Sequence, residues 1–153
     1  MNRTDLADSY HDRGFGCSQS VLSAFCEDYG MDPITALRIS TGFGSGMGRL
    51  CHVCGALTGG FMVLGLKYGK VNSDGSKYGP ATETTYALVS ELARRFEETN
   101  GSILCRELIG LDLSVAENRA YAKEQKLFDT RCVKYIRDVV VLLEDLLQTP
   151  LPV

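Results

Sequence analysis

The sequence is organised around one stretch, Thr41-Gly-Phe-Gly-Ser-Gly-Met-Gly-Arg-Leu-Cys-His-Val-Cys-Gly-Ala-Leu-Thr-Gly-Gly60. Its first part holds four glycines within seven residues, at Gly42, Gly44, Gly46 and Gly48. Two cysteines at C-x-x-C spacing follow, Cys51 and Cys54, and an apolar run then continues to Tyr68. Glycine allows positive φ and a close approach of backbone, so the pattern predicts a shaped loop that leads into a buried helix. The start of that helix should favour an anion or a thiolate.

Length and composition indicate one globular domain. The chain has 153 residues, 44% of them hydrophobic and 23% charged, and a net charge of −3. This charge gives no reason to expect nucleic acid or an anionic membrane as a partner. The longest apolar stretch, near Phe61–Leu66, is too short to span a bilayer, and residues 1–9 lack the apolar core of a signal peptide. We therefore expect a cytoplasmic protein whose six cysteines are thiol, metal or redox groups rather than structural disulfides.

Helical periodicity and capping signals predict an all-α, single-domain bundle of about six or seven helices over residues 1–153, since no segment shows sustained period-two alternation. The expected helices are Asn2–Arg13, Ser18–Tyr29, Ile34–Thr41, Cys51–Tyr68, Thr82 or Thr84 to Asn100, Ile103–Ile109, a helix from Ser114 to Lys126, and Arg131–Gln148. The clearest start signal is Asp32-Pro33, an N-cap followed by proline at the first helical position. Gly59, Gly60 and Gly65 lie inside an expected helix and predict close packing against a neighbour.

Five of the six cysteines fall at predicted helix starts. Cys17 opens the second helix, Cys51 and Cys54 lie in the first turns of the fourth, and Cys105 and Cys132 follow the candidate caps Ser102 and Thr130. The helix dipole favours a thiolate there by about 0.3–1 kcal/mol. We expect Cys54 to be the most reactive thiol, with a pKa below the roughly 8.5 of a free cysteine. Cys26, late in the second helix, is expected to be a small core residue.

The C-x-x-C pair alone leaves redox, zinc and iron–sulfur chemistry open. The chain has no second C-x-x-C and only two histidines, His11 and His52, which argues against a zinc finger. His52 lies between Cys51 and Cys54 and could assist a thiolate. Cys51 and His52 form a second tier of candidate site residues. Covalent haem is not expected, because Gly55 rather than histidine follows Cys54.

The glycine-rich loop invites comparison with a phosphate-binding loop. No Lys-Ser/Thr pair follows it and no strand precedes it, so a nucleotide site is not predicted. Its members Gly44, Gly46, Gly48 and Arg49 are instead expected to lie near the cysteine site. Glycine would provide a wall of close approach there, and Arg49 a nearby cation that could bind an anion.

Several stretches of the chain resemble the C_GCAxxG_C_C family of redox-active proteins. They are Gly16–Val21, Gly42–Arg49 with Cys54–Gly59, Leu64–Gly69, Cys105–Gly110, and Cys132 at the start of the last helix. The likeness runs from about residue 10 to residue 147. It implies that Cys17, Cys54, Cys105 and Cys132 are the family cysteines, with Cys51 and Cys26 as extras. One departure is that the central motif reads Cys54-Gly55-Ala56, with the glycine after the cysteine.

Three interpretations follow from the residues and from this resemblance. The first is a redox protein in which Cys17, Cys54, Cys105 and Cys132 gather at one site and cycle between thiols and disulfide. The second is an electron-transfer or sensing module that holds an iron–sulfur cluster on the same cysteines; a similar domain is present in the split-Soret cytochromes, which have an associated iron–sulfur centre. The third is a structural or interaction protein with buried cysteines. The redox partner and the oligomeric state are left open.

Overall fold

The computed structural model describes residues 1–152, and its regular elements are all helical, as the sequence predicts. They are α1 (Arg3–Asp12), α2 (Cys17–Phe25), η1 (Cys26–Tyr29), α3 (Pro33–Ser40), η2 (Thr41–Phe43), α4 (Gly44–Met47), α5 (Gly55–Tyr68), α6 (Pro80–Asn100), α7 (Cys105–Ile109), α8 (Ala116–Glu124), the π-helical turn η3 (Phe128–Cys132) and α9 (Val133–Leu146). Seven of these have eight or more residues, which agrees with the expected six or seven helices. None of the helices within residues 1–152 combines the length and the apolar character needed to cross a membrane.

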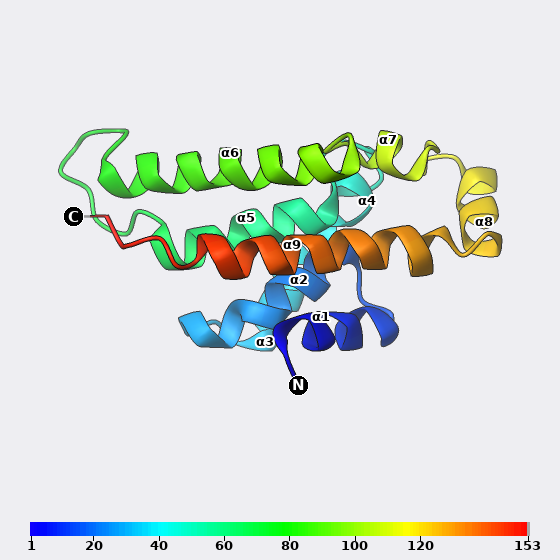
Figure 1. The fold of residues 1–153 in the computed structure, drawn as a ribbon, viewed down its shortest axis with the longest axis horizontal. Helices are drawn as coiled ribbons and strands as arrows, with labels where there is room; N and C mark the ends of the chain where they lie inside the picture. The colour runs from blue at the N-terminus through cyan, green and yellow to red at the C-terminus, as the bar shows by residue number, and fades with distance from the viewer. Residues whose placement is uncertain (153) are drawn as a thin grey trace.

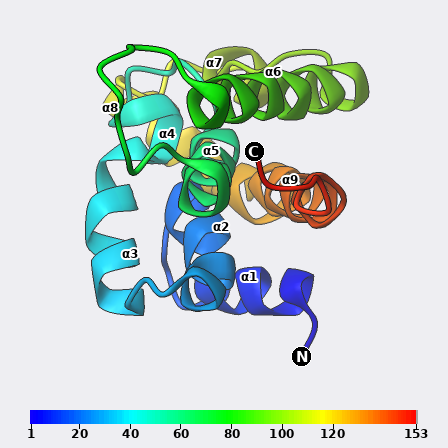
Figure 2. The same ribbon diagram turned by 90° about the vertical axis from the view of Figure 1, so that its left-hand side faces the viewer.

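The helices stack in three layers, which Figures 1 and 2 show from two directions. The long helix α6 forms one outer layer, α5 and α9 lie side by side in the middle, and α1, α2 and α3 form the other outer layer. The middle layer carries much of the core, because α9 buries a continuous stripe that includes Ile136, Val139 and Leu143. The short elements α4, α7 and α8 lie at the end of the molecule away from the C-terminus (Figure 1).

Glycines in α5 allow it to pack tightly in the middle layer. A Cβ placed on Gly59 would come within 2.7 Å of the Ser18 carbonyl oxygen in α2, and one on Gly60 would come within 2.9 Å of Leu92 in α6. These two positions confirm the expected close packing. The same expectation is wrong for Gly65, since nothing lies within 4 Å of a Cβ built there. The helix α5 is thus pressed against α2 near its start, where the cysteines lie.

Several predicted helix starts are correct because the capping signal is local. Asn2 accepts a hydrogen bond from the Asp5 amide at 2.8 Å, and Asp32 accepts one from the Thr35 amide at 3.0 Å. The helix α2 begins at Cys17, as expected.

Other helix boundaries differ from the prediction. The helix α5 begins at Gly55 rather than Cys51, and α7 begins at Cys105 rather than Ile103. Pro80 occupies the first turn of α6, so that helix begins before Thr82. Ser114 lies outside α8, which begins at Ala116. The shifts at α5 and α7 arise because residues 52–54 and 103–105 pair with each other across the chain, which holds both segments in a non-helical form.

Candidate functional site

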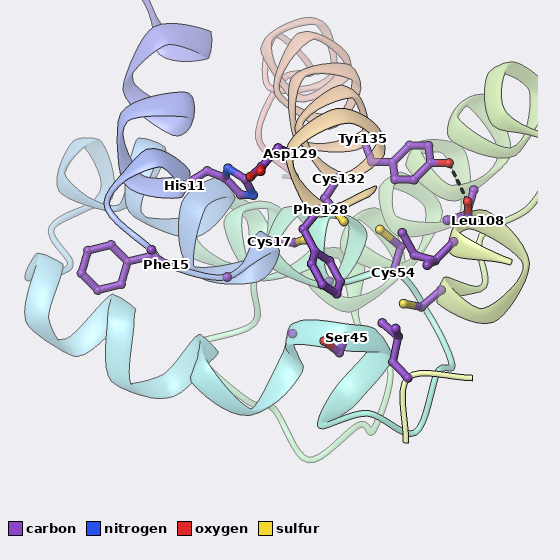
Figure 3. A pocket seen from close by; sticks show the side chains of 17 residues that line it. His11, Phe15, Cys17, Ser45, Cys54, Leu108, Phe128, Asp129, Cys132 and Tyr135 are labelled. Atoms are coloured by element: carbon purple, nitrogen blue, oxygen red, sulfur yellow. Dashed lines mark hydrogen bonds between the residues drawn. The ribbon is translucent and has the colours of Figure 1, made fainter. Parts of the chain in front are cut away.

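Four cysteines that are far apart in the sequence line one cavity of about 300 Å³. They are Cys17, Cys54, Cys105 and Cys132. Figure 3 shows the side chains of Cys17, Cys54 and Cys132 converging from different elements on this space. Cys54, Cys105 and Cys132 are buried, with 5%, 7% and 8% of their surface exposed, whereas Cys17 is half-buried. All six cysteines of the chain are free thiols.

Cys17 is placed by the glycine-containing segment between α1 and α2. Gly14 has a φ of +95°, which turns the chain, and Gly16 caps α2 with extended backbone. The Gln19 side chain accepts a hydrogen bond from the Gly16 amide at 2.9 Å and donates one to the Leu37 carbonyl at 3.1 Å. The first turn of α2, and with it Cys17, is therefore held both by its own cap and by α3.

Cys54 and Cys105 are held together through their backbones. Val53 and Leu104 form an isolated antiparallel bridge, flanked by two short hydrogen bonds. The Cys54 amide donates to the Ile103 carbonyl at 2.8 Å, and the Cys105 amide donates to the His52 carbonyl at 2.6 Å. Because Cys54 precedes α5 directly and Cys105 opens α7, the bridge sets these two helix starts side by side.

A left-handed turn leads into this bridge. The φ angles lie between +55° and +68° at Ser45, Gly46, Met47, Gly48 and Arg49. The Gly48 amide closes the turn by donating to the Gly44 carbonyl at 2.9 Å. Each non-glycine residue in this region costs roughly 1–2 kcal/mol, so the turn persists because its surroundings hold it. Gly46 is required, since a Cβ there would lie 2.8 Å from the Cys105 Cβ and 2.6 Å from the His52 amide nitrogen. The expected shaped loop of close approach is thus present at Gly46.

Cys132 reaches the cavity from a π-helical turn, not from a helix start. The turn η3 runs continuously into α9, so the prediction that Thr130 caps the last helix and that Cys132 lies at its N-terminus is wrong. The Thr130 hydroxyl instead bonds back to the Lys126 carbonyl at 2.9 Å. The Arg131 side chain donates to the Ile109 carbonyl at 2.8 Å and thereby fixes η3 against α7. π-Helical turns inside helices are frequent at functional sites.

Cys17 and Cys132 are neighbours at the cavity (Figure 3). The neighbouring Cys132 thiol is the largest cause that raises the pKa of Cys17 well above its ordinary value, and burial adds to it. For Cys105, burial is the largest cause and raises the pKa to about 12, with the nearby Cys54 thiol adding to it. Cys17 and Cys105 are therefore neutral thiols at neutral pH.

The expectation of a lowered pKa at Cys54 is wrong. Burial raises the pKa of Cys54 to about 12, and the neighbouring Cys17 adds to the rise. The backbone N–H groups of Ala56 and Leu57, in the first turn of α5, act in the opposite direction as the helix-end argument requires. Their effect is the smaller one, because the free-energy cost of removing a thiolate from water exceeds the stabilisation that a helix N-terminus gives it.

Some residues predicted to join the site do not line the cavity. Cys51 does not line the cavity but is buried next to it, with its sulfur 3.3 Å from the amide of the lining residue Leu113, which donates to it. His52 is exposed and takes part through its backbone. Of the glycine-rich loop, Gly44 lines the cavity, whereas Gly46 supports it from behind and Gly48 and Arg49 are exposed at the surface. Cys26 is fully buried, which confirms it as a core residue.

The spacing of the thiols bears on the iron–sulfur alternative. Four cysteines are the usual donors of such clusters. Within residues 1–152, however, no three side chains of His, Cys, Asp or Glu are placed so that they could hold one metal ion. This finding concerns a single metal ion, and the cysteine sulfurs around an iron–sulfur cluster lie farther apart because they bind different iron atoms.

The cavity also contains titratable residues that the sequence analysis did not select. His11 at the end of α1, Asp129 in η3 and Tyr135 in α9 all line it (Figure 3). The Tyr135 hydroxyl donates to the Leu108 carbonyl at 3.0 Å, and burial raises its pKa. The one sequence signal for His11 is its place just before the glycine segment that leads to Cys17, and Asp129 lies about one helical turn before Cys132.

The fold and the cavity define a class: an all-α domain that gathers four sequence-distant cysteines at one site. Residues 15–146 match the family described as "Putative redox-active protein (C_GCAxxG_C_C)". Since the match covers most of the chain, the protein belongs to this family. The comparisons with curated proteins and with solved structures found no match.

Proposed function

We propose that the protein is a thiol–disulfide redox protein in which Cys17 and Cys132 are the exchanging pair. The observation that carries this proposal is that Cys17 and Cys132 are neighbours at one cavity, which Cys54 and Cys105 also line. A disulfide needs its two sulfurs within bonding reach, and two neighbouring thiols at one cavity can reach this with a small movement. Cys17 is the entry point for an incoming oxidant, because it is partly exposed and the other three thiols are buried.

The proposed reaction uses a disulfide of low molecular weight as the electron acceptor. The Cys17 thiolate attacks one sulfur of that disulfide, forms a mixed disulfide and releases the first leaving thiolate. The Cys132 thiolate then attacks the Cys17 sulfur, forms the internal disulfide and releases the second thiolate. The two cysteine protons pass to the two leaving thiolates. Two protein thiols are thus oxidised while one small disulfide is reduced to two thiols.

Disulfide mapping tests this proposal. The reduced protein is treated anaerobically with one equivalent of hydroxyethyl disulfide, quenched with acid, alkylated and analysed by peptide mass spectrometry. We expect the Cys17–Cys132 disulfide to form first. Cys17→Ser and Cys132→Ser should abolish it, and Cys26→Ala, in the core, should leave it unchanged. Should all six cysteines remain reduced, or should the first disulfide join other residues, the assignment is wrong and a structural role for the cysteines becomes the better interpretation.

The iron–sulfur module is the second candidate, because four thiols at one cavity match the donor number of a cluster. Anaerobic purification followed by visible spectroscopy and iron analysis tests it. A brown protein with stoichiometric iron that is lost in Cys54→Ser and Cys105→Ser would favour the cluster over the disulfide.

A further inference from the structure

The cavity brings an imidazole to the same space as the four thiols. His11 lies in the last turn of α1 and lines the cavity together with Cys17, Cys132 and Asp129. Figure 3 shows His11 and Asp129 on the same side of this cavity, across from Cys54. Neither the C_GCAxxG_C_C pattern nor the proposed exchange chemistry gives His11 a role.

Thiol–disulfide exchange needs a thiolate, and the cavity opposes its formation. Burial and thiol–thiol contact raise the pKa values of Cys17, Cys54 and Cys105. A group that accepts the proton would therefore remove a real obstacle to the reaction. Among the side chains that line the cavity, imidazole is the one whose ordinary titration falls near neutral pH.

We propose that His11 accepts the proton of the attacking Cys17 thiol and returns it to the leaving thiolate. This inference rests on the proposed thiol–disulfide function. The cavity volume of about 300 Å³ has room for roughly ten water molecules at ~30 Å³ each, so a water molecule can relay the proton between the imidazole and the thiol. The imidazolium formed would also stabilise the thiolate by its charge.

The surroundings of His11 agree with this role. His11 shares the cavity with Cys17 of α2 and with Asp129 and Cys132 of η3. Asp8 and Asp12 flank it in α1, and Arg137 of α9 is the partner of Asp8. Asp8 is occupied by Arg137 in an ion pair with an oxygen–nitrogen distance of 2.6 Å. Asp129 is exposed and brings a carboxylate to the same side of the cavity as His11 (Figure 3).

The two histidines of the chain give a matched pair of variants. His11→Gln removes the imidazole from the cavity, whereas His52→Gln removes an exposed imidazole outside it. The rate at which hydroxyethyl disulfide oxidises each reduced protein is measured from pH 5 to 10. We expect His11→Gln to be slowed about 100-fold at pH 7 and to lose the part of the pH profile that rises between about pH 5 and 8. His52→Gln should keep the wild-type rate and profile.

Chemical rescue separates proton transfer from a structural effect. Added imidazole should restore the rate of His11→Ala, because the small base can enter the cavity, and it should leave the wild-type rate unchanged. A His11→Gln protein with the wild-type rate and profile would overturn the role of His11 while the Cys17–Cys132 disulfide still forms. If the wild-type protein forms no such disulfide, the proposed function fails and this inference fails with it.

Discussion

Two alanine substitutions in one helix test whether α5 must approach α2 closely. Gly59 and Gly65 both lie inside α5, so each change to alanine should gain about 1 kcal/mol of helix stability. At Gly65 nothing lies within 4 Å of the new Cβ, and the gain should be retained. At Gly59 the Cβ would lie 2.7 Å from the Ser18 carbonyl oxygen and 3.1 Å from the Ser18 Cα. These are backbone atoms that cannot rotate away, so overpacking should cost roughly 3 kcal/mol.

The expected result is a change of opposite sign in the free energy of unfolding. Gly65→Ala should stabilise the reduced protein by about 1 kcal/mol and Gly59→Ala should destabilise it by about 2 kcal/mol. For a chain of this size the melting temperature should move by about 2–4 °C per kcal/mol. Urea unfolding followed by circular dichroism measures both variants under one condition. If Gly59→Ala were as stable as Gly65→Ala, the argument that this glycine lets α5 pack closely against α2 would be refuted.

Three further predictions concern the turn, the thiols and the core. Gly46→Ala should lose at least about 2 kcal/mol of stability, because its φ is +67° and the new Cβ would meet backbone at 2.6 Å, whereas Gly42→Ala should stay within about 0.5 kcal/mol in the same thermal melts. The raised pKa values of Cys54 and Cys105, about 12 in each case against 9.0 ordinarily, mean that the unfolded chain loses protons first. The free energy of unfolding should therefore keep the full contribution of these thiols below about pH 9 and lose it as the pH rises towards 12. The loss should be less steep in Cys54→Ala, when the unfolding of both proteins is measured at each pH under reducing conditions. Leu143→Ala, at a fully buried position of α9, should cost about 2–5 kcal/mol, and a loss below 1 kcal/mol in urea unfolding would contradict its place in the core.

The parts of the fold that the sequence predicted well are those specified by neighbours in the chain. The Asp32 cap, the start of α2 at Cys17 and the apolar stripe of α9 each depend on residues within a few positions of one another. The start of α5 could not be predicted from neighbouring residues. Residues 51–54 remain non-helical because Ile103 and Cys105 pair with them across the chain, and no local signal in the sequence reveals that pairing.

The same distinction between local signals and distant contacts applies to the candidate site. Spacing and family resemblance selected the four cysteines that line the cavity, because the cysteines themselves are visible in the sequence. His11 and Asp129 escaped selection because their place at the cavity results from the packing of α1 on α9. Arg49 was selected for its sequence neighbours, yet the left-handed turn leaves it exposed at the surface.

The direction of the thiol pKa shifts shows that burial, rather than the helix ends, determines the protonation of Cys54 in the cavity. A helix end stabilises a thiolate by about 0.3–1 kcal/mol, which is less than one pKa unit. The pKa of about 12 at Cys54 lies three units above 9.0, which corresponds to roughly 4 kcal/mol against the thiolate. The effect of burial on the pKa of Cys54 is therefore much larger than the opposing effect of the Ala56 and Leu57 amides. Thiols held neutral in this way resist unproductive oxidation, since oxidants attack the thiolate. Reaction then depends on a group that can take the proton within the cavity, and the imidazole of His11 is placed to do so.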